Sequence, residues 1–161
     1  MMKRISRSLC LNYLWKGIRR YVRSLEESGN MKNIKALILD DEAIKSSAIK
    51  RALKSCGICD IRECSNQESG MEYIYQCLKE GSPVGLVVTD MYYPLEFGQE
   101  PDENGGIKLI ERLTKENIEI PVIICSSINI REHRALGCVW YNKNRDLNMD
   151  FKDVVSRLQI Q

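Results

Sequence analysis

The sequence lacks the histidine and cysteine patterns that are typical of transition-metal sites and of disulfide frameworks. Among its 161 residues there is a single histidine, His133, and the seven cysteines are an odd number. The segment Cys56-Gly57-Ile58-Cys59, with Cys64 nearby, supplies only half of a zinc site, which normally needs two such pairs. The sequence therefore predicts reduced thiols in a cytoplasmic protein rather than a zinc centre or a disulfide framework.

Long apolar runs and glycine-rich loops are also missing. No apolar run is long enough to span a membrane, and residues 1–30 lack the uninterrupted apolar stretch of a signal peptide. No glycine-rich phosphate loop follows the first predicted strand, which argues against nucleotide binding. Internal repeats and low-complexity segments are absent too.

Charge is unevenly distributed along the chain, although the net value is only +2. Residues 1–30 contain seven Lys/Arg and two Glu, whereas the remaining 131 residues contain 17 Lys/Arg and 20 Asp/Glu. The main body is therefore mildly acidic, and its charge gives no support to nucleic-acid binding.

Residues 1–30 form a distinct segment ahead of a domain at 31–161. Apolar residues recur at helical spacing, with Lys and Arg around the rest of the circumference, and they are Leu11, Leu14, Trp15, Ile18, Val22 and Leu25. The segment is predicted to be a basic amphipathic helix that lies on an anionic membrane surface or packs on the body or a second copy. Alternatively, residues 1–30 are not part of the natural protein. Met31 stands just before the first predicted strand, where the initiating methionine of many proteins stands.

From residue 34 onward, strand-like and helix-like patterns alternate. Strands are predicted at 34–39, 60–64, 84–90, 120–125 and 138–141, and helices at 43–55, 67–79, 107–115, 128–136 and 147–158. Residues 91–106 are predicted to be a long loop. This alternation predicts an α/β fold with a parallel sheet covered by helices on both faces.

The third strand, Leu86-Val87-Val88-Thr89-Asp90, ends abruptly in a carboxylate. An apolar run without polar alternation is typical of a strand buried on both faces. In open α/β sheets, ligands bind beyond the carboxyl ends of the strands. Asp90 is therefore a candidate functional residue.

Other polar residues follow neighbouring strands at the same edge: Asp40 and Asp41 after the first, Ser126 after the fourth and Lys143 after the fifth. Three carboxylates close together repel one another, and Mg²⁺ would relieve that repulsion. A lysine and a hydroxyl beside them would suit a phosphoryl group. Taken singly, each residue would more often be a helix cap, a turn former or a solvated side chain.

Over residues 32–161 this set resembles the receiver domain of two-component response regulators. The resemblance is carried by Asp40-Asp41, Asp90, Pro94, Gly105-Gly106, the segment 121–126 and Lys143. It implies a flavodoxin-like (βα)5 three-layer sandwich with a five-stranded parallel sheet of order 2-1-3-4-5. It also implies a phosphoacceptor protein with possible autodephosphorylation rather than an enzyme in the usual sense.

The resemblance further implies a role for each residue. Asp90 would accept a phosphoryl group from a phosphohistidine, and it would bind Mg²⁺ together with Asp41. Asp40 would reach the ion through water, and the backbone carbonyl of Tyr92 would complete its protein ligands. Ser126 and Lys143 would contact phosphoryl oxygens, and Ser126 would act as a switch together with Trp140.

The implied partners are a sensor histidine kinase or histidine phosphotransfer protein and a downstream protein that receives the signal. No nucleic-acid partner is expected, and membrane contact would be possible only through residues 1–30. One alternative is a pseudo-receiver, which keeps the fold but binds its partner without phosphorylation. Another is an enzyme on a flavodoxin-like or a haloacid-dehalogenase-like sheet, and the second of these would require an aspartate where Tyr92 stands.

The sequence departs from the family pattern in four places, one of which is Trp140, bulkier than the usual Tyr or Phe. Leu95 to Asn104 form an acidic insertion, which would gate access to Asp90, choose partners or simply be a solvated loop extension. The stretch from Ser126 to Lys143 is short, so the fourth helix should be cut down. Asn144 replaces the usual proline after Lys143, which argues against a cis peptide there.

Overall fold

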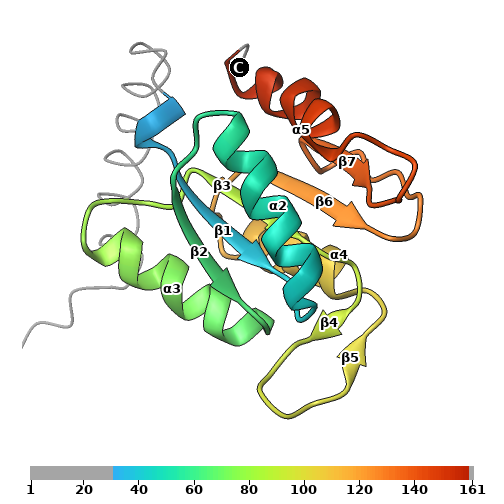
Figure 1. The fold of residues 1–161 in the computed structure, drawn as a ribbon. Coiled ribbons are helices and arrows are strands. Elements are labelled where there is room, and N and C mark those ends of the chain that lie inside the picture. The colour runs from blue at the N-terminus through green and yellow to red at the C-terminus, as the bar shows by residue number, and fades with distance from the viewer. Residues whose placement is uncertain (1–30, 160–161) are drawn as a thin grey trace, which may run out of the picture.

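The computed structural model describes residues 31–159, so the predicted helix at 1–30 lies outside the described part. The elements in chain order are η1 (Met31–Asn33), β1 (Lys35–Leu39), α2 (Ala43–Ser55), β2 (Asp60–Cys64), α3 (Gln67–Lys79), β3 (Leu86–Thr89), β4 (Tyr93–Pro94), β5 (Pro101–Asp102), α4 (Gly105–Lys115), β6 (Val122–Ser126), β7 (Gly137–Trp140), α5 (Leu147–Ser156) and η2 (Arg157–Gln159) (Figure 1). None of the helices in this part of the chain is long and apolar enough to cross a membrane.

Five strands form one parallel sheet in the order β2-β1-β3-β6-β7. Because β6 and β7 are the fourth and fifth of these strands along the chain, this is the predicted order 2-1-3-4-5. The central strand β3 is buried along its whole length, as its uninterrupted apolar sequence predicts. The carboxyl ends of all five strands therefore meet at one edge of the sheet.

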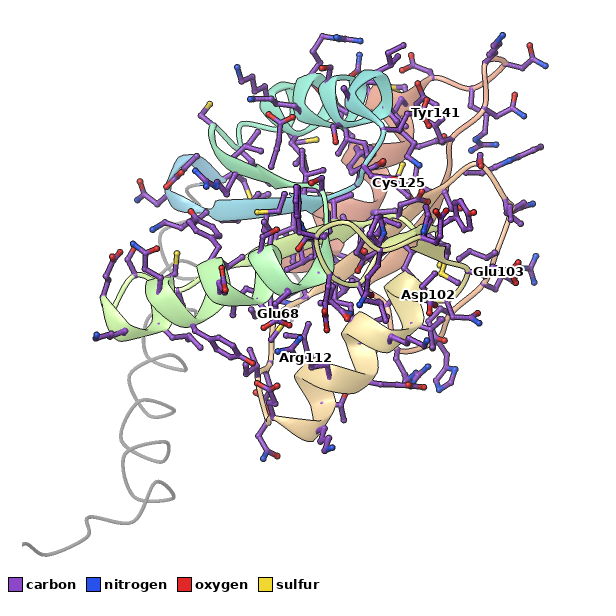
Figure 2. The ribbon with its side chains drawn as sticks, turned by 90° about the horizontal axis from the view of Figure 1, so that it is seen from below. Glu68, Asp102, Glu103, Arg112, Cys125 and Tyr141 are labelled. Carbon is purple, nitrogen blue, oxygen red and sulfur yellow. The ribbon has the colours of Figure 1, made fainter. Side chains whose placement is uncertain are left out.

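Helices cover both faces of the sheet and complete the predicted three-layer sandwich. Side chains alternate between two cores, as the period of a strand requires. Ile38 and Val88 face the core under α2 and α5, whereas Leu37 and Val87 face the core under α3 and α4. Figure 1 shows α2 and α5 on one side of the sheet, with α3 and α4 on the other. On that second side, Arg112 of α4 donates a hydrogen bond of 2.8 Å to Glu68 of α3 (Figure 2).

The predicted helix at 128–136 was wrong, because residues 127–136 form bends and turns without a helix. Ile128 is 64% exposed, and Arg131 and Glu132 stand one helical turn after it. The segment therefore has no continuous apolar stripe that packing on the sheet would stabilise. The second face of the sheet is covered by two helices and this loop.

The predicted loop at 91–106 contains a small antiparallel hairpin made of β4 and β5. Tyr93 is fully buried, and its hydroxyl donates to the carbonyl of Gly105 over 3.3 Å. The backbone N–H of Glu68 donates to the carbonyl of Leu95 at 2.9 Å, which joins the hairpin to the start of α3. The hairpin is thus anchored to the domain at its base, beside the edge that carries Asp90, whereas residues 96–100 at its tip are exposed (Figure 1).

Candidate functional site

Three buried polar residues lie at the carboxyl ends of the three central strands. Asp40 follows β1, Asp90 follows β3, and Ser126 is the last residue of β6. The backbone N–H of Asp90 donates to the carbonyl of Leu39 at 2.9 Å, which holds the ends of β1 and β3 side by side. The structure thus brings Asp40 and Asp90 together as predicted, with Ser126 on the adjoining strand.

A lysine that the sequence analysis did not single out lies between the two carboxylates. The ammonium of Lys45, in the first turn of α2, donates to Asp90 Oδ2 at 2.6 Å and lies 3.1 Å from Asp40 Oδ2. All three residues are buried, with exposed fractions of 2% for Lys45, 5% for Asp40 and 6% for Asp90. We refer to these three residues as the Asp–Lys cluster.

Backbone hydrogen bonds hold the other oxygen of each carboxylate. Asp90 Oδ1 accepts from the N–H of Met91 at 2.7 Å, and Asp40 Oδ1 accepts from the N–H of Glu42 at 2.8 Å. Each carboxylate is therefore held by the main chain on one side and by Lys45 on the other. Asp40 Oδ2 has no hydrogen bond, so the charge of Lys45 is its compensating contact.

Burial and neighbouring charges shift the pKa values of Asp40 and Lys45. Burial raises the pKa of Asp40 to about 6, against the lowering effects of the Glu42 N–H and of Lys45. Burial alone would lower the pKa of Lys45, but the hydrogen bond to Asp90 and the charge of Asp40 more than offset it, so this pKa lies above its ordinary value. The lysine is therefore the ammonium ion at neutral pH.

The remaining predicted site residues lie nearer the surface. Asp41 is exposed, and Tyr92 is about half exposed. Lys143 is exposed, and no carboxylate among residues 31–159 pairs with it. Trp140 is 37% exposed, and its Nε1 donates to the carbonyl of Ser127 at 3.0 Å.

A sequence signal for Lys45 does exist. Lys45 stands four residues before Ile49 and seven before Ala52, on the stripe that α2 buries against the sheet. A lysine on the buried stripe of a helix requires an acidic partner, because burying an unpaired charge is costly. The sequence spacing within α2 therefore indicates that Lys45 lies on the buried face of this helix, close to the end of β1.

The overall arrangement matches known receiver structures. A response regulator from Thermotoga maritima aligns with a TM-score of 0.58 at 17% identity, covering 80% of this chain and 98% of that one. The chain has the fold of a response regulator receiver domain. The receiver domains of NarL from Mycobacterium tuberculosis and of non-phosphorylated HemR from Leptospira biflexa align with TM-scores of 0.57 and 0.55. NarL is 16% identical to this chain, and its alignment covers 80% of this chain and 98% of that one. HemR is 17% identical, and its alignment covers 78% of this chain and 94% of that one. No protein-family model and no curated protein matches the sequence.

The site residues are not arranged to bind the Mg²⁺ ion that the resemblance implies. Magnesium requires several oxygen ligands at about 2.1 Å in octahedral geometry. Within residues 31–159, no group of three acidic, histidine or cysteine side chains is placed to hold a metal ion. Asp41, the expected direct ligand, is exposed, and the ammonium of Lys45 contacts the inward oxygens of Asp40 and Asp90. The Mg²⁺ requirement stays a prediction, and we assign no step to the ion.

Proposed function

We propose that the chain is a signalling receiver of a two-component system or phosphorelay, in which Asp90 accepts a phosphoryl group. The observation that carries this proposal is the buried carboxylate of Asp90 at the end of the central strand, with Asp40 beside it and Ser126 on the next strand. This is the placement that the receiver fold offers a phosphoacceptor, because ligands of open α/β sheets bind at that edge.

The proposed step is a phosphoryl transfer from a phosphohistidine to Asp90. An oxygen of the Asp90 carboxylate forms a bond to phosphorus while the N–P bond of the donor breaks. The electron pair of that bond stays on the imidazole nitrogen, which then binds a proton. An ionised carboxylate has about four lone-pair positions, and from residues 31–159 those of Asp90 accept two hydrogen bonds, one from Lys45 and one from the N–H of Met91.

The added charge supplies the signal in this proposal. A phosphoryl group brings about −1.5 to −2 charge, by analogy with phosphoserine. Ser126 at the end of β6 and Lys143 after β7 are the side chains proposed to contact it, and Trp140 would report the movement. The phosphoryl donor is proposed to be a sensor histidine kinase or histidine phosphotransfer protein, and the receiver of the signal another protein.

A second candidate function is a pseudo-receiver, a binding module that signals without phosphate. The specific observation in its favour is that Lys45 already forms ion pairs with both inward carboxylates, while Lys143 is exposed and pairs with neither of them. In that case the edge of the sheet is fixed in one state, and partner binding depends on the surface around it.

Phosphorylation with labelled acetyl phosphate tests the proposal. The chain is incubated with and without Mg²⁺, and the acyl phosphate is then reduced with borohydride and located by mass spectrometry. The expected result is a single modified residue, Asp90, and loss of the label in Asp90→Asn.

Asp102→Asn is the matched control, because Asp102 lies in the nearby hairpin and pairs with Lys108 at the surface. It should leave the labelling unchanged. Absence of label on Asp90 under both metal conditions, with partner binding that Asp90→Asn does not alter, would favour the pseudo-receiver.

A further inference from the structure

The Asp–Lys cluster contains its own cation. We infer that Lys45 is the resident counter-ion of this acidic site and that its ammonium takes the place of a divalent metal ion. The inference rests on the proposed function only for the role of Asp90 as acceptor. The placement of Lys45 itself is independent of that role.

The first argument comes from the positions of the oxygens. Lys45 Nζ lies 2.6 Å from Asp90 Oδ2 and 3.1 Å from Asp40 Oδ2, while the opposite oxygens bind backbone N–H groups. The two oxygens that face each other across the site are thus both in contact with the ammonium. A divalent ion bound to the same two oxygens would lie next to a positive charge and would be repelled by it.

The second argument concerns what moving Lys45 would involve. Its side chain is 2% exposed, and the following turns of α2 are fixed by Ile49, Ala52 and Leu53, all fully buried. If the ammonium left, Asp40 Oδ2 would keep no compensating contact, since it accepts no hydrogen bond. Two buried carboxylates would then face each other unpaired. Metal entry therefore competes with an ammonium that already occupies the position between the two carboxylates.

The third argument is that the expected metal ligands do not all lie together at one site. Asp41 lies exposed after β1, and no metal-binding group of three acidic, histidine or cysteine side chains occurs within the described residues. The positive charge that receiver chemistry needs beside Asp90 is supplied here by the chain itself.

Direct metal binding provides the first test. Mn²⁺ is titrated into the full chain, and the free ion is followed by electron paramagnetic resonance, with Mg²⁺ as competitor. The wild-type protein should show no saturable site that depends on Asp90. Lys45→Met should bind Mn²⁺ at least about tenfold more tightly, and Asp90→Asn in that background should abolish the gain.

Lys50→Met is the matched control, because Lys50 lies on the same helix but pairs with Glu63 at the surface. It removes the same charge and should leave Mn²⁺ binding as in the wild type. The inference is overturned if the wild type binds Mn²⁺ as tightly as Lys45→Met through a site that Asp90→Asn removes. Should Lys45→Met fail to fold, that wild-type comparison with Asp90→Asn decides the matter alone.

Phosphorylation in the presence of EDTA separates this inference from the proposed function. Labelling of Asp90 in EDTA supports both, whereas labelling that strictly requires Mg²⁺ overturns the inference and leaves the function standing. If the wild type takes no label and Lys45→Met takes it with Mg²⁺, the inference stands and the proposed function of the natural chain fails. If neither protein takes label, the function fails and Mn²⁺ binding decides the inference.

Discussion

The two halves of the sheet edge differ in how their charged residues are arranged. Beside the ends of β1 and β3, Asp40 and Asp90 are buried, and both contact the buried ammonium of Lys45. At the ends of β6 and β7, Ser126 is buried, but Lys143 is exposed and the connection between the strands is a loop. The difference teaches that internal ion pairs fix one half of this edge, whereas in the other half Lys143 forms no ion pair with any carboxylate of residues 31–159.

The largest expected effect comes from removing the cation of the fixed half. Lys45→Met leaves two buried carboxylates without a counter-charge, and breaking a buried ion pair from one side costs about 3 kcal/mol or more. Urea unfolding of the variant should show this loss of stability. Asp90→Asn should restore part of it in the double variant, because it removes one of the uncompensated charges. No recovery in the double variant would show that the loss comes from packing instead.

The next effect concerns the backbone that carries Asp90. A Cβ on Gly106 would lie 2.6 Å from the carbonyl oxygen of Asp90 and 3.1 Å from Met91 Sδ. Gly106→Ala should therefore destabilise the domain by about 1–3 kcal/mol and lower the rate of Asp90 labelling. In Gly85→Ala, the control, the nearest atom is Ile34 Cγ2 at 3.4 Å, so chemical denaturation should show a much smaller change.

A smaller effect is expected from the surface pair that joins α3 and α4 beneath the fixed half. Arg112 contacts Glu68 at 2.8 Å and Glu116 at 3.2 Å, with partly exposed side chains. Arg112→Leu should cost about 0.5–1 kcal/mol, and high salt should reduce the difference from wild type because solvent ions screen the pair. A salt-independent loss would point to packing of the arginine stem rather than to charge.

The smallest effect is expected at the other lysine of the edge. Lys143 is exposed, so Lys143→Met should change the free energy of unfolding by no more than about 0.5 kcal/mol. Labelling and partner binding should nevertheless respond if Lys143 contacts the phosphoryl group. A destabilisation as large as that of Lys45→Met would remove the contrast between the two halves.

Strands β1, β3 and β6 were predictable because each is an apolar run that a polar residue ends or follows. The same signal located Asp40, Asp90 and Ser126, since the ends of neighbouring parallel strands meet at one edge. Lys45 was missed because its role depends on a carboxylate 45 residues away along the chain, and a lysine within a helix is ordinarily solvated. The helix expected at 128–136 was wrong because local spacing over barely two turns is too weak to specify one.

The loop between β6 and β7 has a consequence for local unfolding. The edge strand β7 packs against α5 on one face, where Gly137 approaches Val154 closely. On the other face, Cys138 packs against the same core as Ile130 and Ala135 of the loop. Central strand β3 has helices over both faces. Amide protons of β7 should therefore exchange with deuterated solvent well before those of β3, so that the molecule opens first at the corner nearest Trp140.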